Sequence, residues 1–572
     1  MRHTSRALAV VAAVAAMALT ACSGGGTAQS GQSGSNSANG PALSDLNIQP
    51  RDALKQGGNL RLTITSMLAS WNSLSTDGNG VDSNDVALFT SPANWIYNAD
   101  GTFKANPDYV EKYDVQAATS SKGQVVTLTL NPKAQWNNGR TIDWADYEAT
   151  WKACNGESTD FKCASTDGFN QMTSVTKGAS DNEVVITYKS SYPDWSSSLS
   201  TVWPKEGVGD AKTFNDGWKT YKNDWLSGPY IVDSVDTAQQ VINLVPNPKW
   251  WGDKPMLDKV SFRALDTAAT GNAFANSEID VLKGIVNADQ YKQAATRSDA
   301  EVRTAGGLQW RHFTFNSESG VLQDVKVRQA IVKGINREAI ANSDLAGIPN
   351  LVPKELMLGN HFFMPGQAGY VDNSTAYAYD ATAAGTDLDA LGWKLNSTSG
   401  YREKDGKTLE FDYAMMPDVS TSKNEGELLQ SQLKAIGVKV NIKNVNSDSF
   451  FTDTVAGGKF GVTAFAWQGT PYPMANVGQI YGCDNSLAQN GGTNFSRYCD
   501  SKVKALISQI DTESDNTKRV ALTNEADKLI WDDVMTVPIY RRLEMTAAPK
   551  NLANYGAFGM QSVRAEDIGF TK

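Results

Sequence analysis

The sequence is poor in the residues and motifs that most catalytic sites need. Its 572 residues include only three histidines, His3, His312 and His361. No GxSxG, HExxH or glycine-rich phosphate loop occurs. We therefore expect neither an enzyme nor an ATPase. Paired acids can hydrolyse glycosides without histidine, and 62 acidic residues make chance pairs common, so a glycosidase is the alternative within the enzyme class.

Blocks of basic residues are also absent. The formal net charge is −10 and the isoelectric point is about 5.1, so we do not expect nucleic acid as a partner. After the first twenty residues, no apolar run approaches the roughly 18 that predict a membrane helix. We expect the remaining body to be water-soluble and large enough for two or more lobes.

The first residues predict an export signal. Arg2 and Arg6 precede thirteen apolar residues, 7–19, too few for the roughly 20 that cross a bilayer as a helix. A basic start, a short apolar core and small residues after it are typical of a secretory signal. The stretch "LTAC", ending at Cys22, resembles the bacterial lipobox, whose cysteine becomes the lipidated first residue. We expect a lipoprotein signal over 1–21; an ordinary secretory signal or an uncleaved anchor is the alternative.

The residues after Cys22 predict a tether. The stretch "SGGGTAQSGQSGSNSANGPA" is almost free of charged and large apolar side chains, so it cannot bury enough surface to offset its ordering entropy. We expect residues 22–50 to form a flexible tether. A linker of about 28 residues has a root-mean-square span of roughly 30 Å, which lets a folded body move near a membrane without leaving it.

The other four cysteines form two close pairs. Cys154 and Cys163 are separated by nine positions, and Cys483 and Cys499 by sixteen. Outside the cytoplasm this spacing predicts two disulfides, Cys154–Cys163 and Cys483–Cys499. A metal site is the competing interpretation. Neither pair has a CxxC spacing or a histidine beside it, so we expect no metal.

Hydrophobic periodicity predicts alternating helices and strands. "GGNLRLTIT", "QVVTLTL" and "NEVVITYK" alternate apolar and polar residues as strands do. "DVKVRQAIVKGINREAIA" places Val325, Val327, Ala330, Ile331 and Ile335 along one helical face. The pattern is typical of an α/β architecture. The same reasoning predicts further elements: a helix from about Asp143, a helix ending at Gly437 followed by a strand with Val438, Val440 and Ile442, two helices between Asp500 and Trp531, and a strand at "TVPIY".

Several stretches, in order, resemble the family 5 extracellular solute-binding proteins of ABC importers, the peptide and nickel type. These are "LTLNPKAQWNNGRTIDWADYEATW", "SGPYIVDSVDTAQQVINLVPNPKWWGDKPMLDKVSF", "NSEID", "VKVRQAIVKGINREAI" and "LLQSQLKAIGVKVNI". The chain departs from the family pattern at single positions: Asn138-Gly139 replaces Asp-Gly, and Trp250 replaces a tyrosine. The resemblance covers about Gly57 to Leu543.

The resemblance implies a two-lobed periplasmic-binding-protein-like fold, type II or cluster C, with an extra inserted α/β domain. By this analogy lobe I is discontinuous and contains residues 51–86, 203–305 and 540–572. The inserted domain II occupies residues 87–202, and lobe III occupies residues 306–539. Chain crossings between the lobes permit hinge closure around a ligand.

The resemblance also directs attention to "FGVTAFAWQGTPYPMANVGQIYGC". An apolar strand, 462–465, is expected to lead Trp467 into a ligand-binding loop with Gln468, Gly469, Thr470 and Tyr472. Peptide-binding members carry an aspartate three residues after the tryptophan, where it pairs with the peptide's amino terminus. This chain has Thr470 there, so a charge-assisted bond worth roughly 1.5–3 kcal/mol is missing. Two groups of candidates add to the site: Trp71 and Asn72 as further ligand contacts, and Asp85 or Asp372 as a substitute acid.

The resemblance implies binding and delivery without chemistry. We expect a monomer with no cofactor, lipid-anchored on the outer face of the cytoplasmic membrane, that passes peptides to an ABC permease. Because the chain has no phosphate loop, permease and ATPase subunits must be separate proteins. Other solutes carried by relatives, including oligosaccharides, haem, opines and nickel chelates, remain alternatives, as does a receptor that senses peptides for signalling. Two histidines after the signal argue against direct nickel binding.

Overall fold

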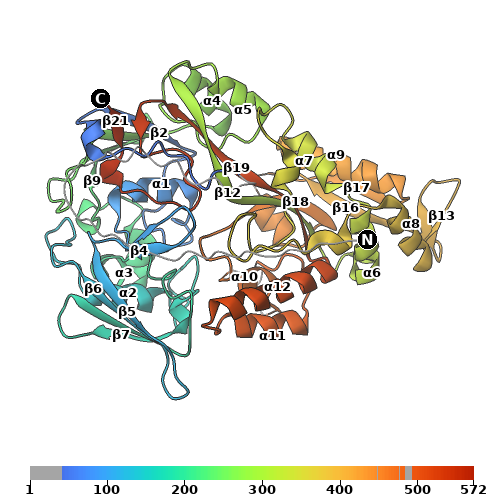
Figure 1. Cartoon of the computed structure of the whole chain (residues 1–572), viewed down its shortest axis with the longest axis horizontal. Coiled ribbons are helices and arrows are strands. Elements are labelled where there is room, and N and C mark those ends of the chain that lie inside the picture. The colour runs from blue at the N-terminus through green and yellow to red at the C-terminus, as the bar shows by residue number, and fades with distance from the viewer. Residues whose placement is uncertain (1–40, 448, 476, 484–492) are drawn as a thin grey trace, which may run out of the picture. The chain divides into compact units, whose positions relative to one another are not determined.

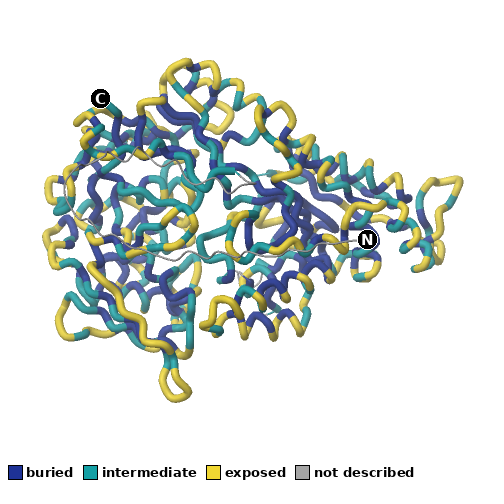
Figure 2. The backbone as a smooth tube through the Cα atoms, in the orientation of Figure 1, coloured by how far each residue is buried: buried dark blue, intermediate teal, exposed yellow. Residues whose placement is uncertain are grey.

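The computed structural model describes residues 41–447, 449–475, 477–483 and 493–572. The predicted signal, Cys22 and most of the predicted tether lie outside this part of the chain. No helix within it is both long enough and apolar enough to cross a membrane. The described body contains mixed helices and sheets, as the sequence predicts, and two large hydrophobic cores (Figures 1 and 2).

The first core is built on two four-stranded sheets that share one set of buried side chains. One sheet has the order β2-β11-β10-β9, with β2 parallel to β11 and the other pairs antiparallel. The other has the antiparallel order β5-β6-β8-β7. The predicted strands are confirmed here, because their alternating residues face the core. The bounds are β2 (Asn59–Ile64), β5 (Val110–Gln116), β6 (Val125–Leu130), β7 (Met172–Lys177), β8 (Glu183–Tyr188), β9 (Tyr230–Asp236), β10 (Val241–Pro246) and β11 (Lys259–Ala264).

The helix predicted near Asp143 is α2 (Trp144–Cys154), which packs against β7. Asp143 caps it: its side chain accepts a hydrogen bond from the backbone of Ala145 at 2.9 Å, and Asp146 accepts one from the backbone of Asp143 at 3.1 Å. This reciprocal capping satisfies donors that the first helical turn leaves free. Cys154, the last residue of α2, forms the predicted disulfide with Cys163.

The second core surrounds a five-stranded mixed sheet with the order β17-β16-β18-β12-β19. Figure 1 shows α7 and α9 above this sheet and α11 and α12 below it. The bounds are β12 (Ala300–Phe315), β16 (Glu410–Met415), β17 (Lys439–Asn444), β18 (Val462–Gln468), β19 (Thr536–Pro549), α6 (Val325–Lys333), α7 (Arg337–Asp344), α8 (Ala381–Ala390), α9 (Ser420–Ala435), α10 (Val477–Tyr481), α11 (Ser501–Ile510) and α12 (Asn516–Asp533).

The single helix predicted through Ile335 is wrong, because the stretch forms two helices, α6 and α7. α6 ends at Lys333 with Gly334 as its cap residue, and the Asn336 side chain accepts from the backbone of Ala339 to begin α7. Glycine weakens a helix interior and asparagine favours an N-cap. Ile335 is still buried, so the hydrophobic pattern correctly predicts burial and not helical continuity.

Strands β12 and β19 connect the two cores. They pair antiparallel along most of their length, with a register shift between Gly306 and Trp310. β19 contributes Val537 to the second core and Ala548 to the first. Residues after β19 then complete the first core, including Leu552 and Phe570. The chain therefore returns to the first core at its C-terminus. Smaller elements are β1 (Leu54–Lys55), α1 (Val81–Thr90), β3 (Trp95–Tyr97), β4 (Phe103–Ala105), α3 (Lys205–Val208), α4 (Thr267–Ala275), α5 (Ala288–Ala294), β13 (Lys394–Leu395), β14 (Arg402–Lys404), β15 (Lys407–Thr408), β20 (Leu552–Ala553) and β21 (Gly569–Thr571).

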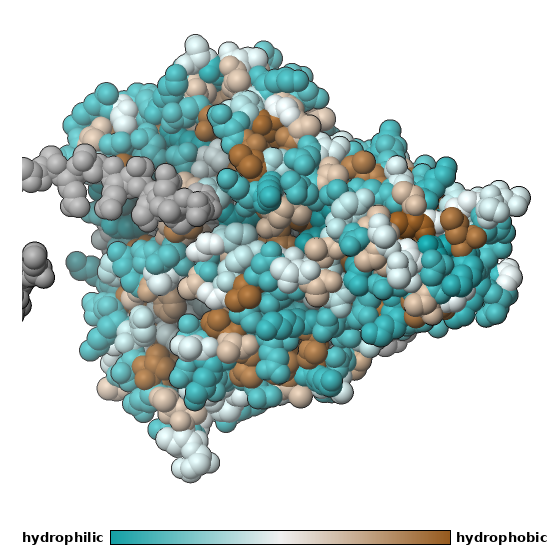
Figure 3. All heavy atoms as spheres, turned by 45° about the vertical axis from the view of Figure 1, so that its right-hand side comes forward, coloured by the Kyte–Doolittle hydropathy of each residue, from teal (hydrophilic) through white to brown (hydrophobic). Residues whose placement is uncertain are grey.

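The surface is mainly hydrophilic on the face in Figure 3, where apolar side chains form small separate groups. Figure 2 shows the most exposed backbone at loop tips, such as the turn between β5 and β6. Functional contacts are therefore better sought in cavities than on a broad apolar patch of this face.

Candidate ligand-binding site

A cavity of about 440 Å³ lies between segments of the first core and the loop that follows β18. One wall comes from residues near 73–79, 164–169 and 192–200, and the opposite wall from residues 470–475 and Gln479. Eleven of the described lining residues carry a hydroxyl or amide side chain. The lining residues are Ser73, Leu74, Asn79, Tyr97, Ala164, Ser165, Asp167, Phe169, Tyr192, Ser197, Ser198, Ser200, Thr470, Pro471, Tyr472, Ala475 and Gln479.

Uncharged polar groups suit neutral parts of a ligand. Asp167 is the one ionisable acid among the described lining residues, which contain no lysine or arginine. Serine, threonine and tyrosine hydroxyls both donate and accept hydrogen bonds, and glutamine and asparagine amides do the same. Such walls can hydrogen-bond to peptide backbone or to sugar hydroxyls.

The loop after β18 is held by its own backbone contacts. The Gly469 amide donates to the Leu308 carbonyl at 2.9 Å, and a side chain at position 469 would begin 3.0 Å from that oxygen, which favours glycine here. The Thr470 hydroxyl accepts a hydrogen bond from the Tyr472 amide at 3.1 Å. Thr470 therefore shapes the turn and also lines the cavity, while its hydroxyl proton remains available to a ligand.

Tyr472 joins the two walls of the cavity. Its hydroxyl lies 3.0 Å from the Tyr97 hydroxyl and 2.9 Å from Ser196 Oγ. Burial raises the pKa of both phenols, so each keeps its proton and one can donate to the other. A phenol bonded on both sides has little freedom to turn, so Tyr472 fixes the distance between the walls.

Two of the predicted loop residues lie on a strand. β18 continues through Trp467 and Gln468, so the expectation that the strand ends at 465 and leads into a loop there is wrong. Trp467 pairs in register with Trp310 of β12. The strand pairing therefore extends beyond the apolar run that predicts the strand. The Trp467 ring stacks on Phe495 with centroids 5.7 Å apart, and its indole nitrogen is buried without a hydrogen-bond partner among the described residues.

Trp467 and Gln468 are thus not among the described residues that line this cavity. Gln468 is exposed at the end of the strand. A ligand group that reaches the Trp467 nitrogen would satisfy a donor whose burial without a partner costs free energy. Their ligand-binding role stays a prediction.

Trp71 and Asn72 are occupied within the first core. Trp71 packs on Tyr221 with ring centroids 6.0 Å apart. Asn72 is fully buried; its amide donates to the Phe214 carbonyl and its oxygen accepts from the Leu74 amide, both at 3.1 Å. The neighbouring Ser73 and Leu74 line the cavity instead. Asn72 therefore positions the cavity wall, and direct contact of Trp71 or Asn72 with a ligand stays a prediction.

The two acids considered as substitutes for the missing aspartate have other partners. Asp85 accepts from the Lys283 ammonium at 2.5 Å. Asp372 accepts from the backbone and hydroxyl of Ser374 at 2.9 and 2.6 Å. Neither is among the lining residues of the cavity, so neither supplies a free carboxylate to it.

Sequence reasoning missed the contributions of Tyr97 and of the segment around Asp194. The run "DWSSSLS" concentrates hydroxyl groups in seven residues, and three of its serines line the cavity. Asp194 itself forms a buried ion pair with Arg519 of α12. The serine run is the one local signal for this wall, and nothing near Arg519 in the sequence indicates its partner.

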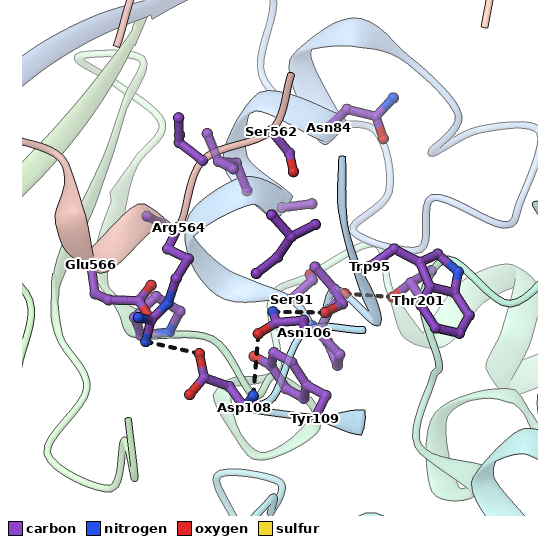
Figure 4. Close-up of a pocket in the computed structure, with 18 of the residues that line it drawn as sticks. Asn84, Ser91, Trp95, Asn106, Asp108, Tyr109, Thr201, Ser562, Arg564 and Glu566 are labelled. Atoms are coloured by element: carbon purple, nitrogen blue, oxygen red, sulfur yellow. Dashed lines mark hydrogen bonds and ion pairs between the residues drawn. The ribbon is translucent and has the colours of Figure 1, made fainter. Parts of the chain in front are cut away.

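A second cavity, of about 230 Å³, lies between α1, β3 and the C-terminal residues (Figure 4). Arg564 is ion-paired there with Asp108 at 3.0 Å, Asp253 at 3.1 Å and Glu566 at 2.7 Å. Burial raises the pKa of the Glu566 carboxyl, while Arg564 opposes that rise. All three carboxylates are thus paired with the same arginine, which favours a packing role for this cavity.

The described residues contain no group of three or more histidine, cysteine, aspartate or glutamate side chains that could hold a metal ion. The predicted disulfide Cys483–Cys499 is present, with a Cα–Cα distance of 4.8 Å. The Cys483 sulfur also lies 3.8 Å from the Asp500 carbonyl. The bond closes a segment shortly after the cavity loop, as the sequence predicts.

Comparison with known proteins gives consistent results. Residues 103–487 match the model of bacterial extracellular solute-binding proteins, family 5 Middle. The oligopeptide-binding protein OppA of Mycobacterium tuberculosis strain H37Rv is 34% identical over 533 residues, which cover 92% of this chain and 87% of OppA. The nickel-binding periplasmic protein of Escherichia coli strain K12 is 22% identical, covering 76% of this chain and 80% of that protein.

Solved structures show the same fold. A periplasmic EDTA-binding protein, EppA, has a TM-score of 0.81 at 23% identity, covering 92% of this chain and 98% of its own. Lactococcal OppA, complexed with an endogenous peptide in the closed conformation, has a TM-score of 0.68 at 23% identity, covering 90% and 100%. These relatives are binding proteins and not enzymes. The chain belongs to family 5 of the bacterial extracellular solute-binding proteins, the solute receptors of ABC importers.

Proposed function

We propose that this chain is a membrane-tethered receptor that binds peptides between its two lobes and delivers them to an ABC import permease. The lipidated Cys22 holds it on the outer face of the cytoplasmic membrane, and residues 22–50 form the tether. The 34% identity to a protein named for oligopeptide binding, over 92% of this chain, supports the choice of peptide.

The single observation that carries the proposal is the cavity whose walls Tyr472 bridges. Its lining, in which Asp167 is the one acid among many uncharged hydrogen-bonding side chains, matches what all peptides share, a backbone of amide donors and carbonyl acceptors. Water can fill the space between variable side chains and such walls. A receptor built this way tolerates many sequences, and Thr470 brings no charge to the position where related peptide receptors carry an aspartate.

We further propose the lobe boundaries that the family resemblance implies. Lobe I contains residues 51–86, 203–305 and 540–572, domain II residues 87–202, and lobe III residues 306–539. The two hydrophobic cores and the β12–β19 crossing support a division into two lobes. Domain II shares the first core with lobe I, and side chains between Ala273 and Ala294 of the proposed lobe I pack in the second core. Hinge motion at the crossing would separate the two walls of the cavity.

An oligosaccharide receptor is the second candidate. Tyrosines and serines around the same cavity can also bind sugar rings and hydroxyls. A receptor that senses peptides for signalling would share the site and differ in selectivity, since it would take one peptide tightly.

Native mass spectrometry of the protein purified from rich medium separates these candidates. A ladder of bound peptide masses supports the proposal, whereas hexose-spaced masses support the oligosaccharide alternative, and one dominant peptide supports sensing. The anchor is tested by Cys22→Ala. This variant should leave the membrane fraction, while Cys499→Ala, which removes a cysteine outside the lipobox, should stay there.

A further inference from the structure

Residues 192–200 form one wall of the ligand cavity and also carry a buried acid that is not among the lining residues. Tyr192, Ser197, Ser198 and Ser200 line the cavity. Asp194 does not line it and is 6% exposed. The wall is therefore attached to the rest of the molecule through a side chain other than those that line the cavity.

The attachment is a two-point ion pair with helix α12. Both terminal guanidinium nitrogens of Arg519 donate to the two carboxylate oxygens of Asp194, one of them at 2.8 Å. The third donor, Nε, bonds the Ile510 carbonyl at 2.8 Å, which orients the guanidinium plane. Arg519 is 3% exposed. Its partner lies 325 residues earlier in the chain, so the pair joins the cavity wall to an element of the second core.

The same wall has a second attachment two residues further on, where the Tyr472 hydroxyl bonds Ser196 Oγ. A bidentate arginine–carboxylate pair is strong and directional, and breaking a buried one leaves an uncompensated charge. Surface ion pairs elsewhere on the chain, such as Arg263–Glu278 with both side chains nearly half exposed, contribute little by comparison.

We propose that Asp194 and Arg519 are positioning residues that hold the cavity closed, and so set the affinity for every ligand by the same factor. Neither contacts the ligand, since neither lines the cavity. The pair acts on the equilibrium between open and closed forms, and a smaller closed fraction lowers the apparent affinity in proportion. The effect on ligand affinity rests on the proposed function. The effect on the equilibrium between open and closed forms does not depend on it.

The test compares ligand-free full-length variants by small-angle scattering and by amide hydrogen exchange over residues 192–200. Asp194→Asn and the conservative Arg519→Lys should each enlarge the radius of gyration and speed exchange in this segment about tenfold or more. The double variant Asp194→Asn with Arg519→Gln should open no further than the single variants, because one interaction is lost in all three.

Glu425→Gln is the matched control. It alters another buried bidentate pair, Arg311–Glu425, within the second core, so it should lower the unfolding temperature and leave scattering and exchange over 192–200 unchanged. Unchanged scattering and exchange in Asp194→Asn and Arg519→Lys, with circular dichroism showing folded protein, would overturn the proposal. Opening in Glu425→Gln as well would also overturn it, because general destabilisation would then explain the result. Scattering and exchange are measured on ligand-free protein, so they do not depend on the identity of the ligand. Mass spectrometry tests the peptide proposal independently.

Discussion

The hydroxyl of Tyr472 lies 3.0 Å from the hydroxyl of Tyr97, and their rings meet edge to face with centroids 6.2 Å apart. The two residues are 375 positions apart in the chain. One comes from the short strand β3 and the other from the loop after β18. This hydrogen bond therefore stabilises the closed cavity in addition to any contacts that the ligand makes.

Tyr472→Phe removes this contact and the bond to Ser196 while keeping the ring. Because each net hydrogen bond contributes about 1 kcal/mol and two are lost, peptide affinity should fall roughly 25-fold. Isothermal titration calorimetry with a peptide identified by mass spectrometry measures this affinity. Tyr97→Phe keeps the Tyr472–Ser196 bond, so its loss should be smaller. Equal affinity for wild type and Tyr472→Phe would contradict the interpretation.

Thr470→Asp should restore recognition of a free amino terminus. An aspartate can accept the Tyr472 amide as Thr470 does, so the turn survives and a negative charge enters the cavity wall. We expect affinity for peptides with a free amine to rise about tenfold. Acetylated peptides should show no gain. Thr470→Asn keeps the turn without charge and serves as the control; a similar gain in this variant would refute the charge argument.

The fold could be predicted where short-range signals decide it. Asp143 caps α2 because a capping acid precedes an amphipathic run, and the close spacing of Cys154 and Cys163 leads to their disulfide. Ile335 shows the limit of periodicity, since its burial is predicted correctly and its helical conformation is not. Local propensity at Gly334 and Asn336 outweighs the pattern there.

The site was less predictable because its walls come from distant segments. Thr470 and Tyr472 line the cavity as expected, since family resemblance identifies that loop. The same resemblance predicts a ligand contact for Asn72, yet its amide donates to the Phe214 carbonyl inside the core. The bond between Asp194 and Arg519 depends on how two elements dock, and such docking leaves no spacing signal in the sequence.

Asp344 should make stability depend on pH. Burial, with the nearby Glu425 carboxylate adding to it, raises its pKa to about 7 from an ordinary value of 3.8. The folded state thus holds a proton that the unfolded chain releases near pH 4. The resulting stabilisation is full below about pH 4 and is lost as the pH rises to about 7.

Asp344→Asn should flatten this pH dependence. The Asn oxygen can accept from Asn424, and its amide can donate to the Tyr540 hydroxyl, which now bonds the aspartate at 3.1 Å. The variant should be more stable than wild type at pH 8 by about 1 kcal/mol, after allowing for solvent screening. Denaturant unfolding at pH 5 and pH 8 measures the free energy of unfolding of both proteins. The same change in this free energy between the two pH values in wild type and variant would exclude this role for Asp344.

The disulfide Cys154–Cys163 should affect binding as well as stability. Cys163 pairs with Ser75 in a short bridge, and the Ala164 amide donates to the Leu74 carbonyl at 2.8 Å. Leu74 and Ala164 both line the cavity, so the disulfide ties that wall to the end of α2. Replacing both cysteines by alanine should lower the free energy of unfolding by roughly 2–3 kcal/mol and weaken peptide binding.

The pair Cys483–Cys499 is the matched control for this prediction. It closes a loop of comparable length, so its removal should destabilise the protein by a similar amount in the chain-entropy account. Neither of its cysteines lines the cavity, and binding should change less. Thermal unfolding and titration of both double variants separate the two effects. Equal losses of affinity would mean that disulfides act on binding through global stability alone.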